Sequence, residues 1–150
     1  MKEERMETIS DILREKGDQV WTVGEDATVS DAVELMAEKN IGAVVILDDN
    51  RKPVGIVSER DVTRSILSKG SQLLELPVSE IMTRQVKCVR ETLSIAEAMA
   101  VMTHNRFRHL PVCREDTLAG VVSIGDVVKA EIHEQEFVID QLEHYIAGSL

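Results

Sequence analysis

Two pairs of serine and aspartate recur in this chain with the same spacing. The stretch GIVSERD places Ser58 three residues before Asp61, and GVVSIGD, 65 residues later, places Ser123 three residues before Asp126. Each pair ends an apolar run and opens a segment with helical patterning. Because the amides at a helix N-terminus favour anionic groups, a hydroxyl and a carboxylate there could hold a polar ligand. Each aspartate could instead simply stabilise its helix through the helix dipole.

These pairs belong to an internal repeat. Residues 23–50 align with residues 89–116 at an offset of 66, and residues 55–62 then align with residues 120–127 at an offset of 65. The change of offset corresponds to a one-residue deletion in a turn. An ordered series of matches with one gap in a turn indicates a duplication.

Each repeat contains the same order of predicted elements. A short extended piece leads to an amphipathic helix, which Thr28 or Ser30 can cap in the first repeat and Ser94 in the second. An apolar hairpin with a polar turn follows, and a second helix begins at Asp61 or Asp126. This β-α-β-β-α order predicts an α/β fold in which two units complete each other's core as a pseudo-symmetric pair.

The repeats divide the chain into five predicted segments. In order, these are an N-terminal helix (1–16), the first repeat (17–69), a linker (70–81), the second repeat (82–131) and a C-terminal helix extension (132–150). The last segment is assigned as a helix because apolar residues continue at helical spacing past the second repeat.

The composition limits the classes of function. The net charge of −10 argues against a nucleic-acid backbone or an anionic membrane as partner. No apolar run approaches the roughly 18 residues of a membrane span, and the N-terminus is charged throughout. The cysteines Cys88 and Cys113 form no CxxC motif. We therefore expect both cysteines to be unpaired, to serve as small apolar residues in strands, and to lie in a reduced, cytoplasmic chain.

Catalytic motifs are missing from the sequence. It contains no recognisable pair of nucleophile and base, no cluster of metal-ligating side chains and no phosphate-binding P-loop. We therefore expect no catalytic residues, no metal site, no required cofactor and no enzymatic activity.

Five phrases resemble a known family. NIGAVVILDD, GIVSERDV, IMTRQVKCV, NRFRHLPV and GVVSIGDVV follow one another in this order inside the repeats. Together they resemble a tandem pair of cystathionine-β-synthase (CBS) domains over residues 17–131, of the small stand-alone bacterial type. The resemblance implies two clefts between the repeats, in which the family binds adenosyl ligands. We therefore expect a regulatory protein whose ligand is AMP, ATP or NAD(H).

The resemblance also implies the site residues. In each cleft an aspartate would accept the ribose hydroxyls and a serine would offer its hydroxyl to phosphate. The first cleft would combine Ser58, Arg60 and Asp61 with Thr83, Arg84, Gln85 and Val86, and with Arg108 and His109. The second cleft would combine Ser123 and Asp126 with Gln19, Val20, Trp21 and Ala43.

The two clefts are not expected to be equivalent. Arg60 in the first repeat stands where the second repeat has Gly125, and an arginine can contact a phosphate through two hydrogen bonds. The first cleft should therefore favour a phosphorylated ligand. As alternatives, the arginines could be solvated surface charges, His109 a histidine at the edge of the core, and Trp21 a packing residue.

Assembly and partners are predicted from the helices. Their apolar stripes exceed what one small sheet covers, which favours a homodimer with two-fold symmetry. The alternative is a monomer whose terminal segments cover the stripes, and the C-terminal helix could either clasp the partner or fold back on its own chain. The stripes contain Val33, Met36, Val62, Ile66, Met99, Met102, Val127 and Val128. The effector would be the second copy or a separate protein of unknown identity. A dimeric scaffold with unoccupied clefts is the alternative function, and an enzyme is the least favoured one.

Overall fold

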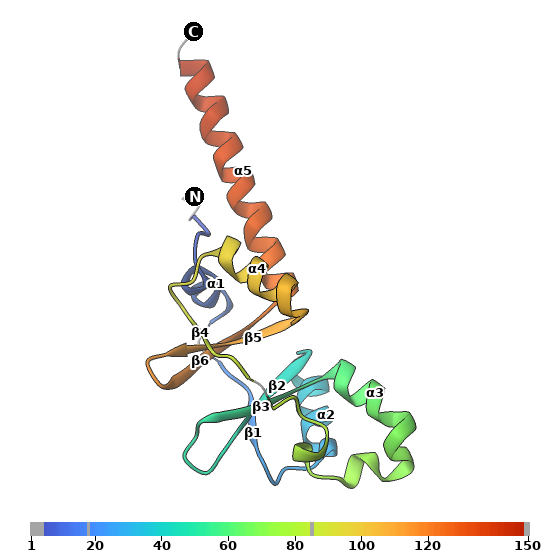
Figure 1. Ribbon diagram of the computed structural model, residues 1–150. Helices are drawn as coiled ribbons and strands as arrows, with labels where there is room; N and C mark the ends of the chain where they lie inside the picture. Colours follow the sequence, from blue (N-terminus) through green and yellow to red (C-terminus); the bar gives the residue numbers. More distant parts are fainter. Residues whose placement is uncertain (1–4, 18, 85, 149–150) are drawn as a thin grey trace. The chain divides into compact units, whose positions relative to one another are not determined.

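The computed structural model describes residues 5–17, 19–84 and 86–148 (Figure 1). The chain divides into two compact units. Unit 1 comprises Met1–Asp18, Cys88–Glu115 and Ala119–Leu150, and unit 2 comprises Gln19–Lys87 and Asp116–Leu118. The first repeat therefore lies in unit 2, and most of the second repeat lies in unit 1 together with the N-terminal helix.

Unit 2 is built around a three-stranded sheet of order β1-β2-β3. Strand β2 pairs in parallel with β1 and antiparallel with β3. Its elements are β1 (Thr22–Gly24), α2 (Val29–Lys39), β2 (Ala43–Leu47), β3 (Pro53–Ser58), α3 (Glu59–Lys69) and the 3₁₀ helices η1 (Gly70–Glu75) and η2 (Val78–Glu80). Val44, Ile46 and Val57 are fully buried and form the core with residues of α2 and the segment around η2.

The second sheet has the order β4-β5-β6, with β4 parallel to β5. The second repeat and the N-terminal helix supply α1 (Ile9–Lys16), β4 (Val89–Arg90), α4 (Ile95–Asn105), β5 (His109–Arg114), β6 (Thr117–Ser123) and α5 (Ile124–Gly148). Leu110, Val112 and Val122 of this sheet are buried against apolar residues of α1, α4 and α5. The predicted α/β fold with two repeats of the same element order is therefore confirmed.

Hydroxyl and carboxylate side chains fix where the helices begin. Thr28 caps α2 and Ser94 caps α4, each by accepting a hydrogen bond from the backbone N–H three residues later. In α3 the N-cap is Ser58, so the helix begins at Glu59 and Asp61 is its third residue. The prediction that the second helix of each repeat begins at its aspartate is thus wrong by two residues, because the serine ends the strand and caps the helix.

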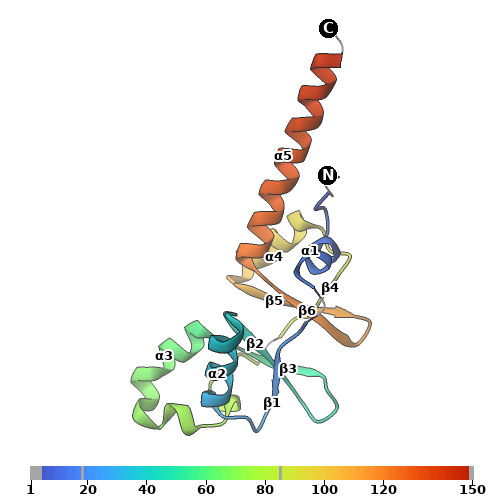
Figure 2. The ribbon, with the colours of Figure 1, turned by 180° about the vertical axis from the view of Figure 1, so that it is seen from behind.

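Each repeat is completed by a segment from outside it. The N–H of Ile9 in α1 donates to the carbonyl of Leu93, beside α4, at 2.9 Å. In unit 2 the N–H of Val78 in the linker donates to the carbonyl of Ala27 at 2.8 Å. Figures 1 and 2 both show α1 beside α4 and β4. The N-terminal helix thus packs on the second repeat, and the linker packs on the first.

The two glycines of the repeated phrases allow this close packing. A Cβ atom at Gly55 would lie 2.9 Å from Cγ of Met82, which directly follows the linker. A Cβ atom at Gly120 would lie 2.6 Å from Cδ2 of Leu13, which comes from α1. Both distances are shorter than ordinary contact, so each glycine makes room for a side chain of the segment that covers its repeat.

Most of the residues predicted to form a dimer interface are core residues instead. Met36 and Met102 are 4% and 1% exposed, and Val127 is fully buried. Val33, Val62 and Met99 pack against the two cores. Among the predicted interface residues only Ile66 and Val128 are exposed, at 53% and 41%. The small sheets do cover these stripes, because an outside segment adds apolar residues to each core.

The two cysteines are paired. Cys88 and Cys113 form a disulfide, with their Cα atoms 5.6 Å apart. Strand β4 pairs in parallel with β5 so that Arg90 lies opposite Cys113, which brings Cys88 near the same strand. The prediction of two unpaired apolar cysteines is therefore wrong. The sequence separation of 25 residues gave no sign of this register.

Candidate functional site

Ser58 and Asp61 form a reciprocal capping box at the start of α3. The N–H and Oγ of Ser58 both donate to Oδ2 of Asp61, at 2.8 and 3.0 Å, and the N–H of Asp61 donates back to Ser58 Oγ at 3.2 Å. Among the described residues, Oδ1 of Asp61 accepts no hydrogen bond. The Asp61 carboxylate is thus held in a fixed orientation by one oxygen, and the other oxygen is available to a ligand.

The segment after η2 runs beside the end of β3. Thr83 exchanges backbone hydrogen bonds with Ile56 at 2.9 and 3.0 Å, two residues before Ser58. The guanidinium of Arg84 donates to the carbonyl of Ser79 at 3.0 Å, which fixes that side chain. Unit 2 therefore contains most of the first predicted set, namely Ser58, Arg60, Asp61, Thr83, Arg84 and Val86, whereas Gln85 lies outside the described residues.

Arg60 is the second residue of α3 and is exposed. It makes no ion pair in the described part of the chain. Its guanidinium is therefore available close to the capping box, whereas one nitrogen of the Arg84 guanidinium already donates to a backbone carbonyl.

Four residues of the second predicted set also lie in unit 2. Ala43 is buried and stands directly opposite Ser58 in the register of β2 and β3. Gln19 is exposed, and Val20 and Trp21 are half-buried. The ammonium of Lys39 lies 4.4 Å from the centre of the Trp21 ring, a cation–π contact that occupies one face of the indole. The association of these residues with Ser123 and Asp126 stays a prediction.

Ser123 and Asp126 form the corresponding capping box in unit 1, but with an additional partner. The N–H of Ser123 donates to Asp126 Oδ2 at 2.8 Å, and the N–H of Asp126 donates to Ser123 Oγ at 3.1 Å. Lys16 Nζ, at the end of α1, donates to the same Asp126 oxygen at 2.8 Å and to the carbonyl of Val121 at 2.9 Å. The second aspartate is thus held in an ion pair.

This ion pair changes the acidity of Asp126. Burial opposes ionisation of the carboxyl, but the hydrogen bond from Lys16, the N–H of Ser123 and the charge of Lys16 together lower its pKa below the usual value. At neutral pH Asp126 is therefore ionised, and its negative charge is compensated by the ammonium of Lys16.

Arg108 and His109 lie in unit 1, beside the start of α5. The N–H of Ile124 donates to the carbonyl of Arg108 at 2.8 Å. The Arg108 side chain is exposed and His109 is half-buried. Their predicted association with Asp61 joins residues of different units and stays a prediction.

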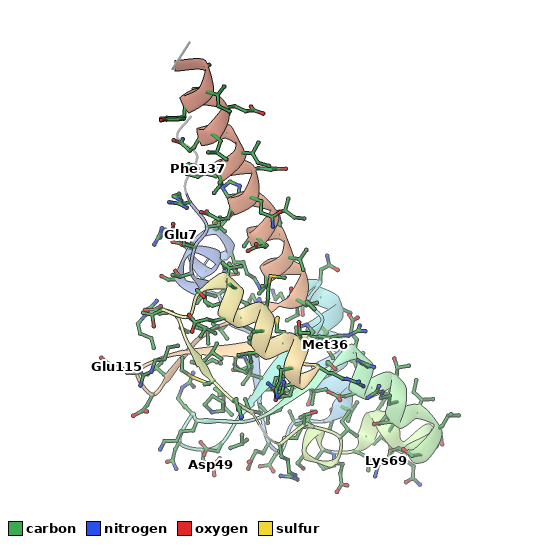
Figure 3. The ribbon with its side chains drawn as sticks, turned by 45° about the horizontal axis from the view of Figure 1, so that its top comes forward. Glu7, Met36, Asp49, Lys69, Glu115 and Phe137 are labelled. Atoms are coloured by element: carbon green, nitrogen blue, oxygen red, sulfur yellow. A yellow bond between two sulfur atoms is a disulfide. The ribbon has the colours of Figure 1, made fainter. Side chains whose placement is uncertain are left out.

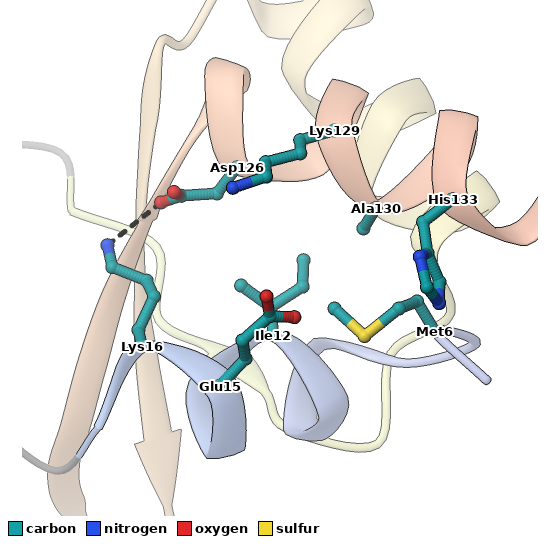
Figure 4. A pocket seen from close by; sticks show the side chains of 8 residues that line it. All are labelled: Met6, Ile12, Glu15, Lys16, Asp126, Lys129, Ala130 and His133. Atoms are coloured by element: carbon teal, nitrogen blue, oxygen red, sulfur yellow. Dashed lines mark hydrogen bonds and ion pairs between the residues drawn. The ribbon is translucent and has the colours of Figure 1, made fainter. Parts of the chain in front are cut away.

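A pocket of about 240 Å³ lies between α1 and α5 in unit 1, with the Lys16–Asp126 ion pair at one end (Figure 4). It is lined by Met6, Ile12, Glu15, Lys16, Asp126, Lys129, Ala130 and His133. Pockets that enclose small molecules usually measure about 300–1,000 Å³, so this pocket alone is too small for a nucleotide.

Sequence reasoning missed the contact between Lys16 and Asp126. The two residues are 110 positions apart, and only the packing of α1 on the second repeat brings them together. The capping role had a visible signal, since Thr28–Asp31 and Ser94–Glu97 have the same spacing as the two serine–aspartate pairs.

No group of three or more His, Cys, Asp or Glu side chains that could hold a metal ion occurs among residues 5–17, 19–84 and 86–148. Over these residues, no helix has the length and apolar character needed to cross a membrane.

Comparison with known proteins identifies relatives over most of the chain. The family model for the CBS domain matches residues 9–68 and 78–133. The mitochondrial CBS domain-containing protein CBSX3 of Arabidopsis thaliana is 38% identical over 150 aligned residues, which cover 94% of this chain and 72% of the relative. The CBS domain-containing protein YhcV of Bacillus subtilis is 27% identical, with 87% and 85% covered.

Solved structures share the fold. The CBS-domain containing protein ATU1752 from Agrobacterium tumefaciens has a TM-score of 0.81 and 37% identity, with 87% of this chain and 98% of that chain covered. The CBS domain pair of MJ0100, crystallised with 5′-methylthioadenosine and S-adenosyl-L-methionine, has a TM-score of 0.72 at 22% identity over 81% and 97% of the chains. At that identity the likeness concerns the fold alone.

Proposed function

Because this chain belongs to the CBS domain family, whose pairs are regulatory modules, we propose that it is a regulatory protein that senses an adenine nucleotide. The ligand class is AMP, ATP or NAD(H). The observation that carries the proposal is the Asp61 carboxylate, which is oriented through Oδ2 while Oδ1 is available. The protein acts by binding and not by catalysis.

Asp61 is suited to the ribose of such a ligand. A carboxylate that is fixed by protein hydrogen bonds can accept hydrogen bonds from the two hydroxyls of a ribose, as acidic residues do in other nucleotide sites. Ser58 supplies two of the hydrogen bonds that fix the Asp61 carboxylate. We therefore assign to Ser58 the role of positioning Asp61, because its hydroxyl is already engaged.

The phosphate of the ligand fits the start of α3. Arg60 is exposed, lies beside Asp61 in the first turn, and can form two hydrogen bonds with a phosphate. The positive end of the helix dipole favours an anion at the same place. In unit 1 the corresponding position is Gly125, and Asp126 is neutralised by Lys16. We call Ser58, Arg60 and Asp61 the Ser58–Asp61 set. The differences between the two capping boxes favour binding of a phosphorylated ligand at this set.

Nucleotide binding would be converted into a signal by a partner. We assign this role to a separate effector protein or to a second copy of the chain, since a regulatory module must change either its shape or its contacts when the ligand binds. A homodimer is the assembly that we propose.

Calorimetry with AMP, ATP, NAD(H), 5′-methylthioadenosine and S-adenosylmethionine tests the proposal. A hydrogen bond to a charged group is worth about 1.5–3 kcal/mol, so Asp61→Ala should weaken binding of the best nucleotide by about 10- to 150-fold. Asp31→Ala is the matched control, because Asp31 occupies the same capping position in α2. It should lower stability as Asp61→Ala does but leave affinity unchanged.

Two results would contradict the proposal. Equal affinities of the wild type and Asp61→Ala for the nucleotide would contradict the assignment of Asp61 as the residue that binds the ribose. Absence of binding by every compound at millimolar concentration would favour the alternative, a dimeric scaffold whose clefts stay empty.

A further inference from the structure

The C-terminal helix carries a row of exposed side chains that are all apolar except Gln135. We call this row the α5 seam, and it consists of Val128, Ile132, Gln135, Ile139, Leu142 and Ile146. Its apolar members are 41–60% exposed. Large apolar side chains that gather on one exposed face mark an interaction site more often than scattered ones do.

The opposite side of α5 holds the helix on unit 1. Val127 and Ala130 are buried in the core, and Glu134 binds Arg5 and accepts a hydrogen bond from the N–H of Met6 at 3.1 Å. The guanidinium of Arg5 lies 4.9 Å from the centre of the Phe137 ring, on the side of α5 that faces the segment carrying Glu7 (Figure 3). These contacts therefore leave the side chains of the seam exposed.

The second half of α5 has no support from its own unit. Every residue from Val138 to Gly148 is exposed, and α5 extends past the other elements of unit 1 (Figure 1). Isolated helices shorter than about 12–15 residues are marginal in water. An apolar row on such a helix is stabilised when another surface covers it.

The spacing of the seam indicates what that surface is. Ile132, Ile139 and Ile146 follow one another at intervals of seven residues. Val128, Gln135 and Leu142 do the same, so the two series alternate in steps of four and three. This is the heptad pattern of a coiled coil, in which the side chains at two core positions of each heptad insert between those of a facing helix.

We propose that the α5 seam binds the same seam of a second copy as an antiparallel two-helix coiled coil. In this arrangement Val128 packs against the partner's Ile146, Ile132 against the partner's Leu142, and Gln135 against the partner's Ile139. The proposal names the surface of the homodimer in the proposed function. It does not depend on nucleotide binding, because it uses residues of α5 only.

The residues that flank the seam select the antiparallel orientation. In an antiparallel pair Lys129 faces the partner's Glu143, and Val138 faces the partner's Val138. In a parallel pair Glu131 would instead face the partner's Glu136, which is repulsive. The antiparallel pair also brings Glu136 near the partner's Glu136. Two-fold symmetry provides the attractive Lys129–Glu143 contact twice, which offsets that single repulsion.

Sedimentation equilibrium of the full chain tests the seam. The wild type should have twice the chain mass of 16.7 kDa at micromolar concentration. Ile139→Glu should weaken dimerisation at least about 100-fold, since it places a charge in the apolar contact. Gln141→Glu adds the same charge on the other side of the helix and should leave the dimer unchanged. Circular dichroism shows whether both variants keep the wild-type helix content.

Charge reversal tests the orientation. Lys129→Glu and Glu143→Lys should each weaken the dimer on the order of tenfold, and the double variant should restore wild-type affinity. A monomeric wild type, or a dimer that Ile139→Glu does not weaken, would overturn the proposed surface. Failure of the double variant to restore affinity would overturn the antiparallel pairing. All of these outcomes are read without nucleotide, so they do not depend on the result of the ligand experiment.

Discussion

Asp61 and Asp126 occupy equivalent positions, but their surroundings differ at the level of single residues. Both carboxylates accept a hydrogen bond from the serine N–H of their capping box. Asp126 also receives the ammonium of Lys16, whose side chain is 43% exposed. A ligand hydroxyl would have to compete with Lys16 for Asp126, whereas no such competitor is present at Asp61 among the described residues.

The ion pair predicts a pH-dependent contribution to stability. The pKa of Asp126 is lowered in the folded chain, so its contribution is present above the usual pKa of an aspartate and is lost as the pH falls through the folded value. At about pH 7, Lys16→Met should therefore lower the free energy of unfolding by about 0.5–1.5 kcal/mol, a range discounted for the exposure of the pair. Urea denaturation of both proteins measures the difference.

The same difference should become smaller as the pH falls below the usual pKa of an aspartate and through the lower folded pKa of Asp126, because Asp126 is then protonated in both proteins. Lys52→Met serves as the control, since Lys52 is an exposed lysine whose side chain forms no ion pair among the described residues. A loss of stability that is equal at neutral and acidic pH would mean that Lys16 contributes through packing and not through its charge.

At the level of elements, the packing of each repeat depends on a glycine that contacts a segment from outside the repeat. At Gly55 a new methyl group would meet Cβ and Cγ of Met82 as well as its sulfur atom, so movement of the end of the side chain cannot relieve the clash. Gly55→Ala should lower the free energy of unfolding by about 1–3 kcal/mol. Gly24→Ala is the matched control, because no atom lies within 4 Å of a Cβ atom there. Thermal or urea unfolding of the two variants compares them, and equal stability would contradict the packing role of Gly55.

Local patterns in the sequence predicted the elements well. The cap Ser94 and the apolar hairpin that contains Ala43–Leu47 depend on residues that are near one another in the chain, so spacing and propensity were sufficient. For α2 the sequence left Thr28 and Ser30 as possible caps, and the structure has Thr28. The starts of α3 and α5 were misplaced because an aspartate three residues after a serine is compatible with two helix starts. The capping box shows that each helix begins directly after the serine and not at the aspartate.

Contacts between distant parts of the chain could not be predicted in the same way. The packing of α1 on the second repeat, the Lys16–Asp126 ion pair and the Cys88–Cys113 disulfide all depend on the final register of packed elements. For the candidate site, the sequence found both serine–aspartate pairs but not the lysine that distinguishes them. The residues assigned to a set across the two units stay predictions.

At the level of the whole molecule, ligand binding and assembly are assigned to different units. The Ser58–Asp61 set lies within Gln19–Lys87, and the α5 seam lies within Ala119–Leu150. Loss of the α5 seam should therefore leave the nucleotide affinity unchanged, and loss of the nucleotide site should leave dimerisation unchanged. Allosteric communication between them would then require a coupling free energy that each site shares with the other.

Deletion of residues 138–150 tests this separation. It removes Ile139, Leu142 and Ile146 from the seam but keeps Glu134 and Phe137, which hold α5 on unit 1. Because the described residues of the deleted part are all exposed, the stability of the monomer should stay within about 0.5 kcal/mol of that of a monomeric full-length variant such as Ile139→Glu. The mass should fall to that of one chain.

Nucleotide affinity measured by calorimetry should be unchanged in the truncated chain if binding and assembly are independent. Should the affinity instead change, the ratio of the two dissociation constants gives the coupling between ligand and dimer directly. By reciprocity, the same nucleotide at saturation must then shift the dimerisation constant of the full chain by the square of that ratio, because a dimer binds one nucleotide on each of its two chains. A change in affinity without that shift would show that residues 138–150 act on the nucleotide set by a route other than dimerisation.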